Sequence, residues 1–262
     1  MKLGISILTF IFFIIIIGCN KNDNSFPPEL PSMQTFLLET KGLENDSFVF
    51  DSKDDNYRNW FVAANKIYDW NFLISANIQI PLNCLFLAYQ YEPKLFADRS
   101  WLWQYDFGVD LDTYQIKMYG TFEVDSSILW EMFVTENNSE SVLLMKGNIN
   151  KFFTQGNWIF YKHIFRPIEI LKIDWLIEEN VLHVNFTNEY EKSTNTGSML
   201  EIIYSIEDTT RVKFNFYNQS TNTNSYMEIN KVLGTGKIMD YEAFNDSLWH
   251  CWDSNFMNED CM

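Results

Sequence analysis

Residues 54–93, DDNYRNWFVAANKIYDWNFLISANIQIPLNCLFLAYQYEP, are the longest segment of the chain whose pattern predicts a helix. Apolar side chains recur there at the three- and four-residue spacing of one helical face. The positions are Trp60, Ala64, Ile67, Asn71, Ile74, Ile78 and Leu85, widened by Ala63, Tyr68 and Phe72. Almost no charge occurs between Asp69 and Glu92, so we expect most of the helix circumference to be covered by the rest of the protein.

Pro81 lies inside this segment. Proline removes one helical hydrogen bond and crowds the preceding turn, so we expect two helical pieces or a kink at about residues 79–82. Cys84 follows among Leu82, Leu85 and Phe86. This setting predicts a buried free thiol, because a reactive thiolate needs cationic, partly exposed surroundings.

The chain after Trp101 changes to a two-residue alternation of apolar and polar side chains. The alternating segments are 116–124, 129–134, 142–146, 158–165, 171–177, 181–186, 200–206, 212–217 and 226–232. Turn-forming residues occur at 136–139, 155–157, 178–180, 208–209 and 220–224. Such strands have one buried and one wet face and are joined by short links. We therefore predict a mainly β, α+β fold, in which an antiparallel meander of about ten strands curls into a barrel-like or strongly twisted sheet against the helical segment.

Composition limits the classes of partner. The chain has 262 residues, of which 47% are hydrophobic and 17% aromatic, enough for one large core. Its formal net charge is −16, with a pI near 4.5. This balance argues against binding to nucleic acid and against electrostatic binding to anionic lipid. We predict a single β-rich globular domain over residues 34–262.

The amino terminus predicts where the protein is located. Lys2 precedes an apolar run over residues 3–17, which is too short for a spanning helix and ends at Gly18-Cys19. This arrangement resembles the lipobox of bacterial lipoproteins, in which signal peptidase II cleaves before the cysteine. The resemblance implies a signal peptide over residues 1–18 and acyl chains on Cys19 that attach the protein to a membrane. Asn20 then favours the outer membrane, on a periplasmic or cell-surface face that the sequence leaves open.

Residues 19–33 follow the predicted lipidation site and contain three of the six prolines. They show no apolar periodicity. We expect them to form an extended tether between the membrane and the folded domain.

Few residues form a pattern that predicts chemistry. If the chain turns at residues 178–180, Asp174 and His183 share one face of a hairpin with Lys172 and Asn185. This group is either a base with its orienting partner or, far more commonly, a set of cross-strand pairs on a wet face. The sequence predicts no catalytic residue, no cofactor and no metal site.

Two acidic segments leave weaker alternatives open. Asp110 and Asp112, near Asp106, could bind Ca²⁺ through their carboxylates, but the further ligands of a known calcium loop are absent from the pattern. In the tail, Cys251 and Cys261 predict a disulfide in an exported protein. The alternatives there are a zinc site that adds His250 to the two cysteines, and a weak Ca²⁺ site. The oxygen donors of that Ca²⁺ site would be Asp253, Asn255, Asn258 and Asp260.

Several short motifs together resemble a family of Bacteroidetes-type exported lipoproteins that end in a His-Cys-Trp-Asp…Asp-Cys pattern. The matching stretches are the lipobox, residues 59–60, 70–71, 101–105, 129–132, 172–175 and 249–253, and Cys261. The resemblance spans most of the chain beyond residue 19. It implies an exported lipoprotein and brings no activity or site residue with it.

The sequence therefore predicts a membrane-anchored lipoprotein of the cell envelope that is a non-enzymatic binding or accessory protein. An apolar ligand, a glycan or an envelope partner would fit its aromatic excess, to which Trp101, Trp103, Trp130, Trp158 and Trp175 contribute. The counter-interpretation is that these tryptophans fill the core. An envelope hydrolase that uses paired carboxylates, and a purely structural or docking module, remain the alternatives.

Overall fold

The computed structural model describes residues 26–36, 55–109, 112–137, 139–162 and 167–261. The helical elements are η1 (Met33–Thr35), η2 (Asp55–Tyr57), α1 (Arg58–Ala88) and α2 (Tyr241–Phe244). The strands are β1 (Lys94–Ala97), β2 (Ser100–Val109), β3 (Asp112–Phe122), β4 (Ile128–Glu136), β5 (Val142–Ile149), β6 (Gln155–Lys162), β7 (Ile168–Glu178), β8 (Val181–Asn188), β9 (Met199–Ser205), β10 (Arg211–Asn218), β11 (Thr223–Asn230), β12 (Thr235–Asp240), β13 (His250–Trp252) and β14 (Asn258–Glu259).

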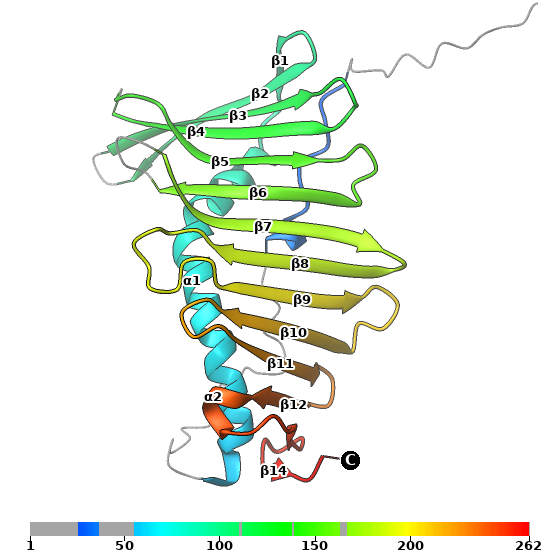
Figure 1. Cartoon of the computed structure of the whole chain (residues 1–262). Helices are drawn as coiled ribbons and strands as arrows, with labels where there is room; N and C mark the ends of the chain where they lie inside the picture. The colour runs from blue at the N-terminus through cyan, green and yellow to red at the C-terminus, as the bar shows by residue number, and fades with distance from the viewer. Residues whose placement is uncertain (1–25, 37–54, 110–111, 138, 163–166, 262) are drawn as a thin grey trace, which may run out of the picture.

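All fourteen strands form one antiparallel sheet in which each strand pairs with its neighbours in the sequence (Figure 1). The predicted meander and the mainly β, α+β class are confirmed. The additional strands are the short edge strand β1 and the three C-terminal strands, which the alternation does not mark.

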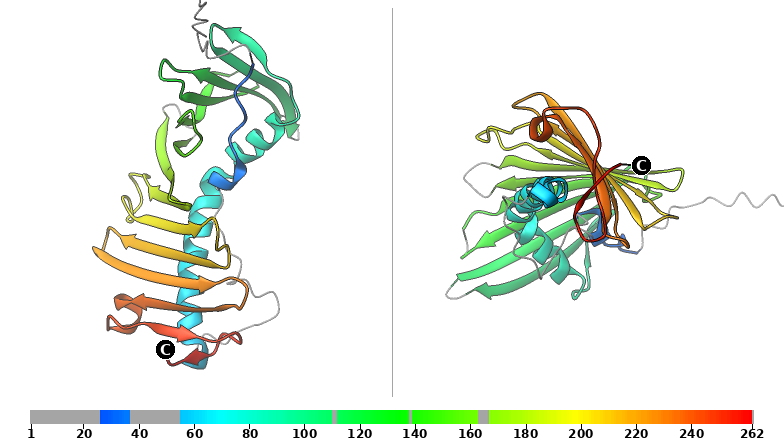
Figure 2. Two further views of the ribbon diagram at one scale, coloured as in Figure 1. Left: turned by 90° about the vertical axis from the view of Figure 1, so that its right-hand side faces the viewer. Right: turned by 90° about the horizontal axis from the view of Figure 1, so that it is seen from below.

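The sheet stays open, so the barrel-like form of the prediction is wrong and the twisted form is right. β1 and β14 are its two edges, and strand direction rotates steadily between them (Figure 2). A helix and an N-terminal segment lie on the apolar face. The sheet therefore has no need to close on itself to bury that face.

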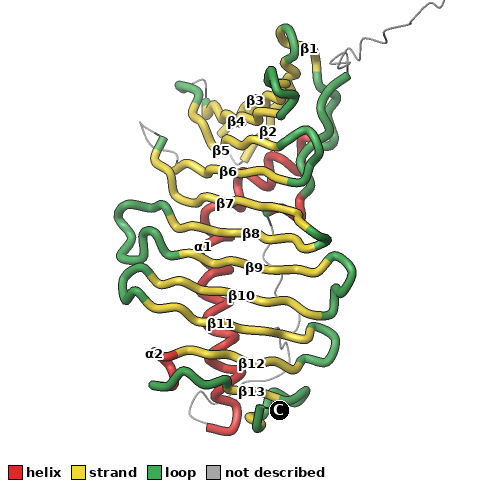
Figure 3. Tube along the Cα trace, turned by 45° about the vertical axis from the view of Figure 1, so that its right-hand side comes forward, coloured by secondary structure: helices red, strands yellow, loops and turns green. Residues whose placement is uncertain are grey.

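Helix α1 crosses this face from the C-terminal strands to β2 (Figures 1 and 3). It buries Asn59, Trp60, Ala63, Ile67, Ile74, Ile78, Pro81, Cys84, Leu85 and Ala88. The predicted helix over residues 54–93 is thus confirmed, with a 3₁₀ turn at its start and its end at Ala88. By length and composition alone, residues 55–88 would suffice to cross a membrane. In the fold, 33% of their most apolar 18-residue stretch is buried inside the protein.

The expectation that most of α1 is covered is wrong. Tyr68 and Phe72 are each 67% exposed, and Ile80 and Phe86 are 66% and 60% exposed. Asn71 is exposed as well. The sheet covers only one side of the helix, so Tyr68, Phe72 and Phe86 leave an apolar stripe on the other side within the described part of the chain.

Pro81 does not divide the helix, because α1 is continuous from Arg58 to Ala88. Of the two expected alternatives, the division into two pieces is therefore wrong. The helix changes direction in its C-terminal part, in the half that contains Pro81 (Figure 2). The Pro81 ring is buried against the protein, and this packing offsets part of the cost of the missing hydrogen bond.

Large tryptophans on the apolar face lie over glycines of the adjacent strand. The pairs are Gly120 with Trp130, Gly147 with Trp158, Gly156 with Trp175, and Gly236 with Trp252. At Gly147 an added Cβ would be 2.1 Å from the Trp158 ring, and at Gly236 it would be 2.2 Å from the Trp252 ring. Each indole therefore needs a neighbour without a side chain.

These contacts decide between the two interpretations of the tryptophans. Trp103, Trp130, Trp158 and Trp175 are at most 5% exposed, so they fill the core and form no binding surface. Trp101 is half-buried. The same contacts correct one predicted turn, because residues 155–157 belong to β6, where the Trp175 ring lies over Gly156. The chain turns earlier, over residues 151–154.

The N-terminal segment over residues 26–36, which we call the strap, also packs on the apolar face. Phe36 is 0% exposed and lies 4.9 Å from Trp158 between ring centroids. Pro28 is buried beside Gly120, and the Pro31 carbonyl accepts a hydrogen bond of 2.5 Å from Tyr89. Part of the predicted tether over residues 19–33 therefore belongs to the folded body, because Pro28 and Pro31 are buried there.

The C-terminal strands bind the start of α1. Cys251 and Cys261 form the predicted disulfide, with Cα atoms 5.3 Å apart. Asn258, on β14, accepts a hydrogen bond of 3.0 Å from the backbone N–H of Asn59, and the Asn59 side chain donates to the Cys251 carbonyl at 2.7 Å. Tyr57, at the N-cap of α1, supplies no side-chain cap, so the tail satisfies one of the exposed N–H groups.

We expect Gly147→Ala to lower the free energy of unfolding by about 1–3 kcal/mol, because the new methyl group would overlap the Trp158 ring and the Asn157 carbonyl. Urea denaturation of the chain from residue 19 onward, with Cys19→Ser, measures the change. Gly108→Ala is the matched control, since a Cβ there would have its nearest neighbour at 3.7 Å. Equal losses in the two variants would contradict the role of the glycine–tryptophan contacts.

Candidate ligand-binding site

Two pockets lie between α1 and one side of the sheet, where the strands end. Residues from Lys66 to Leu73 line the first pocket, and residues from Ile80 to Leu87 line the second. On the sheet side, the pockets are lined from β2–β5 and from β8–β11 with their connections. The β4–β5, β8–β9 and β10–β11 connections lie along this side of the sheet (Figure 3).

The second pocket, which we call the apolar cavity, has a volume of about 510 Å³. Its lining is Ile80, Asn83, Cys84 and Leu87 of α1, with Phe107, Tyr114, Val134, Glu136 and Leu144 of β2–β5. This volume lies within the range that small-molecule sites occupy. Most of the lining is aliphatic or aromatic, so the cavity suits an apolar group.

Two polar side chains of the apolar cavity, Tyr114 and Glu136, are paired with each other. The Tyr114 hydroxyl donates to Glu136 at 3.3 Å, and the Tyr114 ring stacks on Phe107. Desolvation, followed by the carboxylates of Glu136 and Asp112, raises the pKa of Tyr114. The phenol therefore stays protonated and holds the carboxylate beside the cavity.

Cys84 is the buried free thiol that the sequence predicts. Burial raises its pKa to about 11. At neutral pH the sulfur is a thiol, which is a poor nucleophile. Its contribution to the cavity is a small apolar wall.

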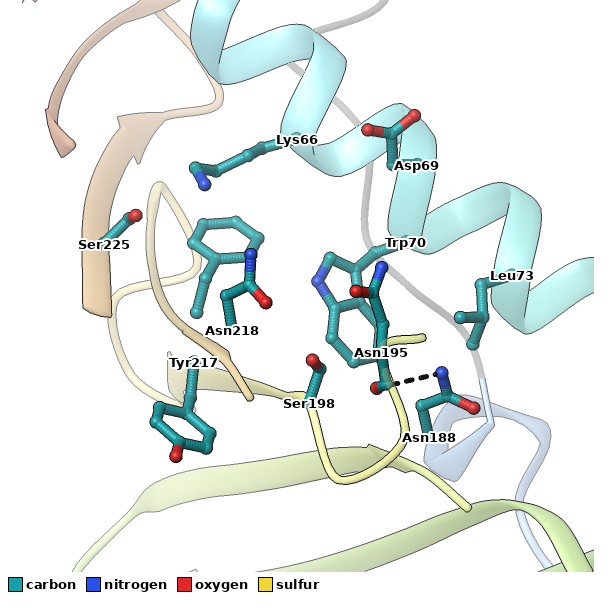
Figure 4. A pocket seen from close by; sticks show the side chains of 11 residues that line it. Lys66, Asp69, Trp70, Leu73, Asn188, Asn195, Ser198, Tyr217, Asn218 and Ser225 are labelled. Carbon is teal, nitrogen blue, oxygen red and sulfur yellow. Dashed lines mark hydrogen bonds between the residues drawn. The ribbon is translucent and has the colours of Figure 1, made fainter. Parts of the chain in front are cut away.

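The first pocket, which we call the polar pocket, has a volume of about 260 Å³ (Figure 4). Its lining is Lys66, Asp69, Trp70 and Leu73 of α1, with Asn188, Asn195, Ser198, Phe216, Tyr217, Asn218 and Ser225 from the sheet and its connections. Figure 4 shows Lys66 and Trp70 of α1 extending toward the amides of Asn195 and Asn218, whereas the Asp69 side chain projects away from them.

Lys66, which lines the polar pocket, forms an ion pair. Lys66 Nζ is 2.7 Å from Asp240, whose side chain is 2% exposed. Burial alone would raise the pKa of Asp240, but the hydrogen bond and charge of Lys66, with donors from Ala243 and Ser225, lower it. Asp240 is therefore ionised at neutral pH and neutralises Lys66.

The Asp174 hairpin has the predicted geometry without a catalytic pair. Asp174 and His183 share one face, but His183 is 3.1 Å from Glu201, and Asp174 is 2.9 Å from Lys172. These side chains are between 30% and 40% exposed. The His183–Glu201 pair joins β8 to β9, whereas the Lys172–Asp174 pair lies within β7, and both are on the outer face of the sheet.

The predicted acidic segments do not assemble into ligand sets. Asp106 accepts a hydrogen bond from Gln115, Asp112 accepts one from Asn137, and Asp110 lies outside the described residues. No three His, Cys, Asp or Glu side chains in the described part of the chain gather around one point that could hold a metal ion.

The tail also differs from its metal-binding alternatives. The sulfurs of Cys251 and Cys261 are bonded to each other, which excludes the zinc alternative in this form of the protein. His250 is 3.0 Å from Asp246 and stacks on Phe244. In the proposed Ca²⁺ group, backbone N–H groups occupy one Asp253 oxygen, and Asn258 binds the start of α1.

No protein-family model matches this chain, and comparisons with curated proteins and with solved structures return no match either. The resemblance to a lipoprotein family stays a prediction. The functional argument therefore rests on the geometry of the two pockets.

The sequence did not predict either pocket. A weak signal is available in the polar residues Lys66, Asp69 and Asn83, which interrupt the apolar helix. The other residues that line the pockets come from segments far apart in the sequence, however. Only the order of the strands brings those segments to one side of the sheet.

We expect Asp240→Asn to lower the free energy of unfolding at pH 7 by about 1.5–3 kcal/mol, because Lys66 loses its charged partner. The pKa of Asp240 is lower in the folded state than its ordinary value of 3.8, so its contribution is present above that pH. The contribution disappears as the pH falls through the lowered pKa. Urea denaturation at pH 7 and at several pH values below 3.8 should show the two proteins converging.

Asp106→Asn is the control for this measurement. Its side chain is exposed, and the substitution should change the free energy of unfolding at pH 7 by less than about 0.5 kcal/mol. A difference between wild type and Asp240→Asn that persists at the lowest pH would contradict the electrostatic explanation.

Proposed function

We propose that this protein is a membrane-anchored lipoprotein of the cell envelope that binds an apolar chain, such as the acyl chain of a lipid, without catalysing a reaction. The apolar cavity beside α1 carries this proposal. Its aliphatic and aromatic lining has no unpaired charge in the described part of the chain, because Glu136 is held by Tyr114. An apolar chain would therefore gain free energy by leaving water, at a cost of little polar desolvation.

The amino terminus supports the location of this function. The apolar run before Cys19 and the Gly18-Cys19 junction favour lipidation, and residues 1–25 lie outside the described part of the chain. Several acyl chains on Cys19 would hold the body at a membrane surface. The strap begins at residue 26, so few residues would separate the cavity-bearing body from the lipid.

A carboxylate-dependent hydrolase is less well supported. Asp125 and Asp174 line one polar hollow on the outer face of the sheet, near the β3–β4 connection. Hydrogen bonds from Ser127 lower the pKa of Asp125, and Asp174 is paired with Lys172. A hydrolase of this kind needs one carboxyl whose pKa is raised so that it can donate a proton.

Binding of a fluorescent fatty acid to the chain from residue 19 onward, with Cys19→Ser, tests the apolar cavity. We expect Ile80→Asp to weaken binding at least tenfold, because a carboxylate at the mouth of the cavity opposes an apolar ligand. Phe72→Asp is the matched control: Phe72 is 67% exposed on the same helix, Ile80 is 66% exposed, and Phe72 does not line the cavity. Equal affinity in the two variants, or no binding by the wild type, would overturn the proposal.

The anchor is tested separately in a bacterium that lipidates exported proteins. We expect the wild-type chain to incorporate a labelled fatty acid and to sediment with membranes. Cys19→Ser should abolish both, while Cys84→Ser serves as the control and should retain both. Labelling that persists in Cys19→Ser would show that the anchor lies elsewhere.

A further inference from the structure

The two pockets share one face of α1. Lys66, Trp70 and Leu73 line the polar pocket, and Ile80, Cys84 and Leu87 line the apolar cavity at the same spacing of four and three residues. Leu73 and Ile80 are seven positions apart, which is about two helical turns, or about 10 Å along the axis. Both pockets therefore follow one stripe of the helix.

The stripe between the pockets carries only short side chains. Ala76 and Asn77 occupy the intervening positions, and Asn77 donates a hydrogen bond to the Leu73 carbonyl within the helix. No large side chain of α1 projects on this stripe between Leu73 and Ile80. Helix α1 therefore places no large side chain in the path of a narrow chain that runs from one pocket to the other.

The polar pocket favours an uncharged group. The charge of Lys66 is neutralised by Asp240, and the Asp69 carboxylate opposes an anion. Trp70 offers the face of an indole ring, which binds surfaces that are partly apolar and partly hydrogen-bonding. These features disfavour a phosphate or carboxylate and favour a ring that carries hydroxyl groups.

Hydrogen-bonding capacity remains at the opening of the polar pocket. Among the described residues, the side-chain amide of Asn195 and the carboxylate of Asp69 have no hydrogen-bond partner. Asn218 uses its oxygen to accept from Ser220, which leaves its NH₂ group available. Asn188, by contrast, is 2% exposed and is used within its own loop. Asn195 and Asn218 can therefore hydrogen-bond to hydroxyl groups beside Trp70.

We propose that the ligand is a glycolipid whose sugar headgroup occupies the polar pocket while its hydrocarbon chain extends along α1 into the apolar cavity. This inference rests on the proposed binding of an apolar chain and adds the chemistry of the headgroup. One molecule that occupies both pockets gains from apolar burial at one end and from directed hydrogen bonds at the other.

The test compares three probes that share a decyl chain. n-Decyl β-maltoside and 1-decanol are uncharged, and n-decyl phosphate is charged. Each is used below the concentration at which it forms micelles or separates from solution. Isothermal titration of the chain from residue 19 onward, with Cys19→Ser, measures the dissociation constants. We expect n-decyl β-maltoside to bind at least tenfold more tightly than 1-decanol and than n-decyl phosphate.

Two variants assign that advantage to the polar pocket. Trp70→Ala, and independently Asn195→Ala in the exposed β8–β9 connection, should reduce the preference for the maltoside and leave the affinity for 1-decanol within twofold. Binding of 1-decanol also shows that each variant is folded. Tyr68→Ala, a change at an exposed α1 position outside both pockets, is the control and should alter neither affinity.

The remaining outcomes overturn the inference in separable ways. Equal binding of 1-decanol and n-decyl β-maltoside would leave the proposed function intact and remove the headgroup site. Tighter binding of n-decyl phosphate would contradict an uncharged headgroup. If free maltose binds but the maltoside binds no more tightly than 1-decanol, the polar pocket is a sugar site that is separate from the apolar cavity. If no probe binds, the proposed function fails, and the glycolipid inference fails with it.

Discussion

Coverage of one apolar face by a single helix is the constraint on which this structure depends. A sheet of fourteen strands exposes more apolar surface on one face than its own turns can protect. Helix α1 and the strap lie on that face, and the tail fastens the N-terminal end of the helix through Asn59 and Asn258. At the other end, the Tyr105 hydroxyl donates to the Cys84 carbonyl. The helix is thus held at both ends of a sheet that would otherwise have no reason to remain open.

The core shows how shape can take precedence over hydrogen bonding. Among the described residues, the indole N–H groups of Trp130, Trp158 and Trp175 have no hydrogen-bond partner although they are buried. Leaving such a group unpaired costs about 1–3 kcal/mol. The close packing of each ring over a glycine must offset that cost, which explains why the large residues and the absent side chains occur in register on adjacent strands.

The sequence predicted those parts of the fold that depend on local periodicity. The helix and most of the strands follow from spacing alone, because each has one face in the core. Gly156 misled the prediction of a turn, since its role is to make room for Trp175 from a different strand. The exposure of Tyr68 and Phe72 could not be predicted either, because apolar spacing does not tell how much of a helix a distant sheet will cover. The pockets combine α1 with strand ends up to 159 residues away, from Lys66 to Ser225, and no local pattern contains that information.

The neighbour-by-neighbour order of the strands has a consequence for how this architecture can change. Each hairpin pairs only with the hairpins before and after it, as in solenoid proteins. Whole hairpins can therefore be gained or lost without changing the pairing of the other strands. The length of α1 limits such growth, because strands added beyond the end of the helix would have an uncovered apolar face. Related chains of different size should therefore vary in paired strands and in helical turns together, keeping a constant ratio between the two.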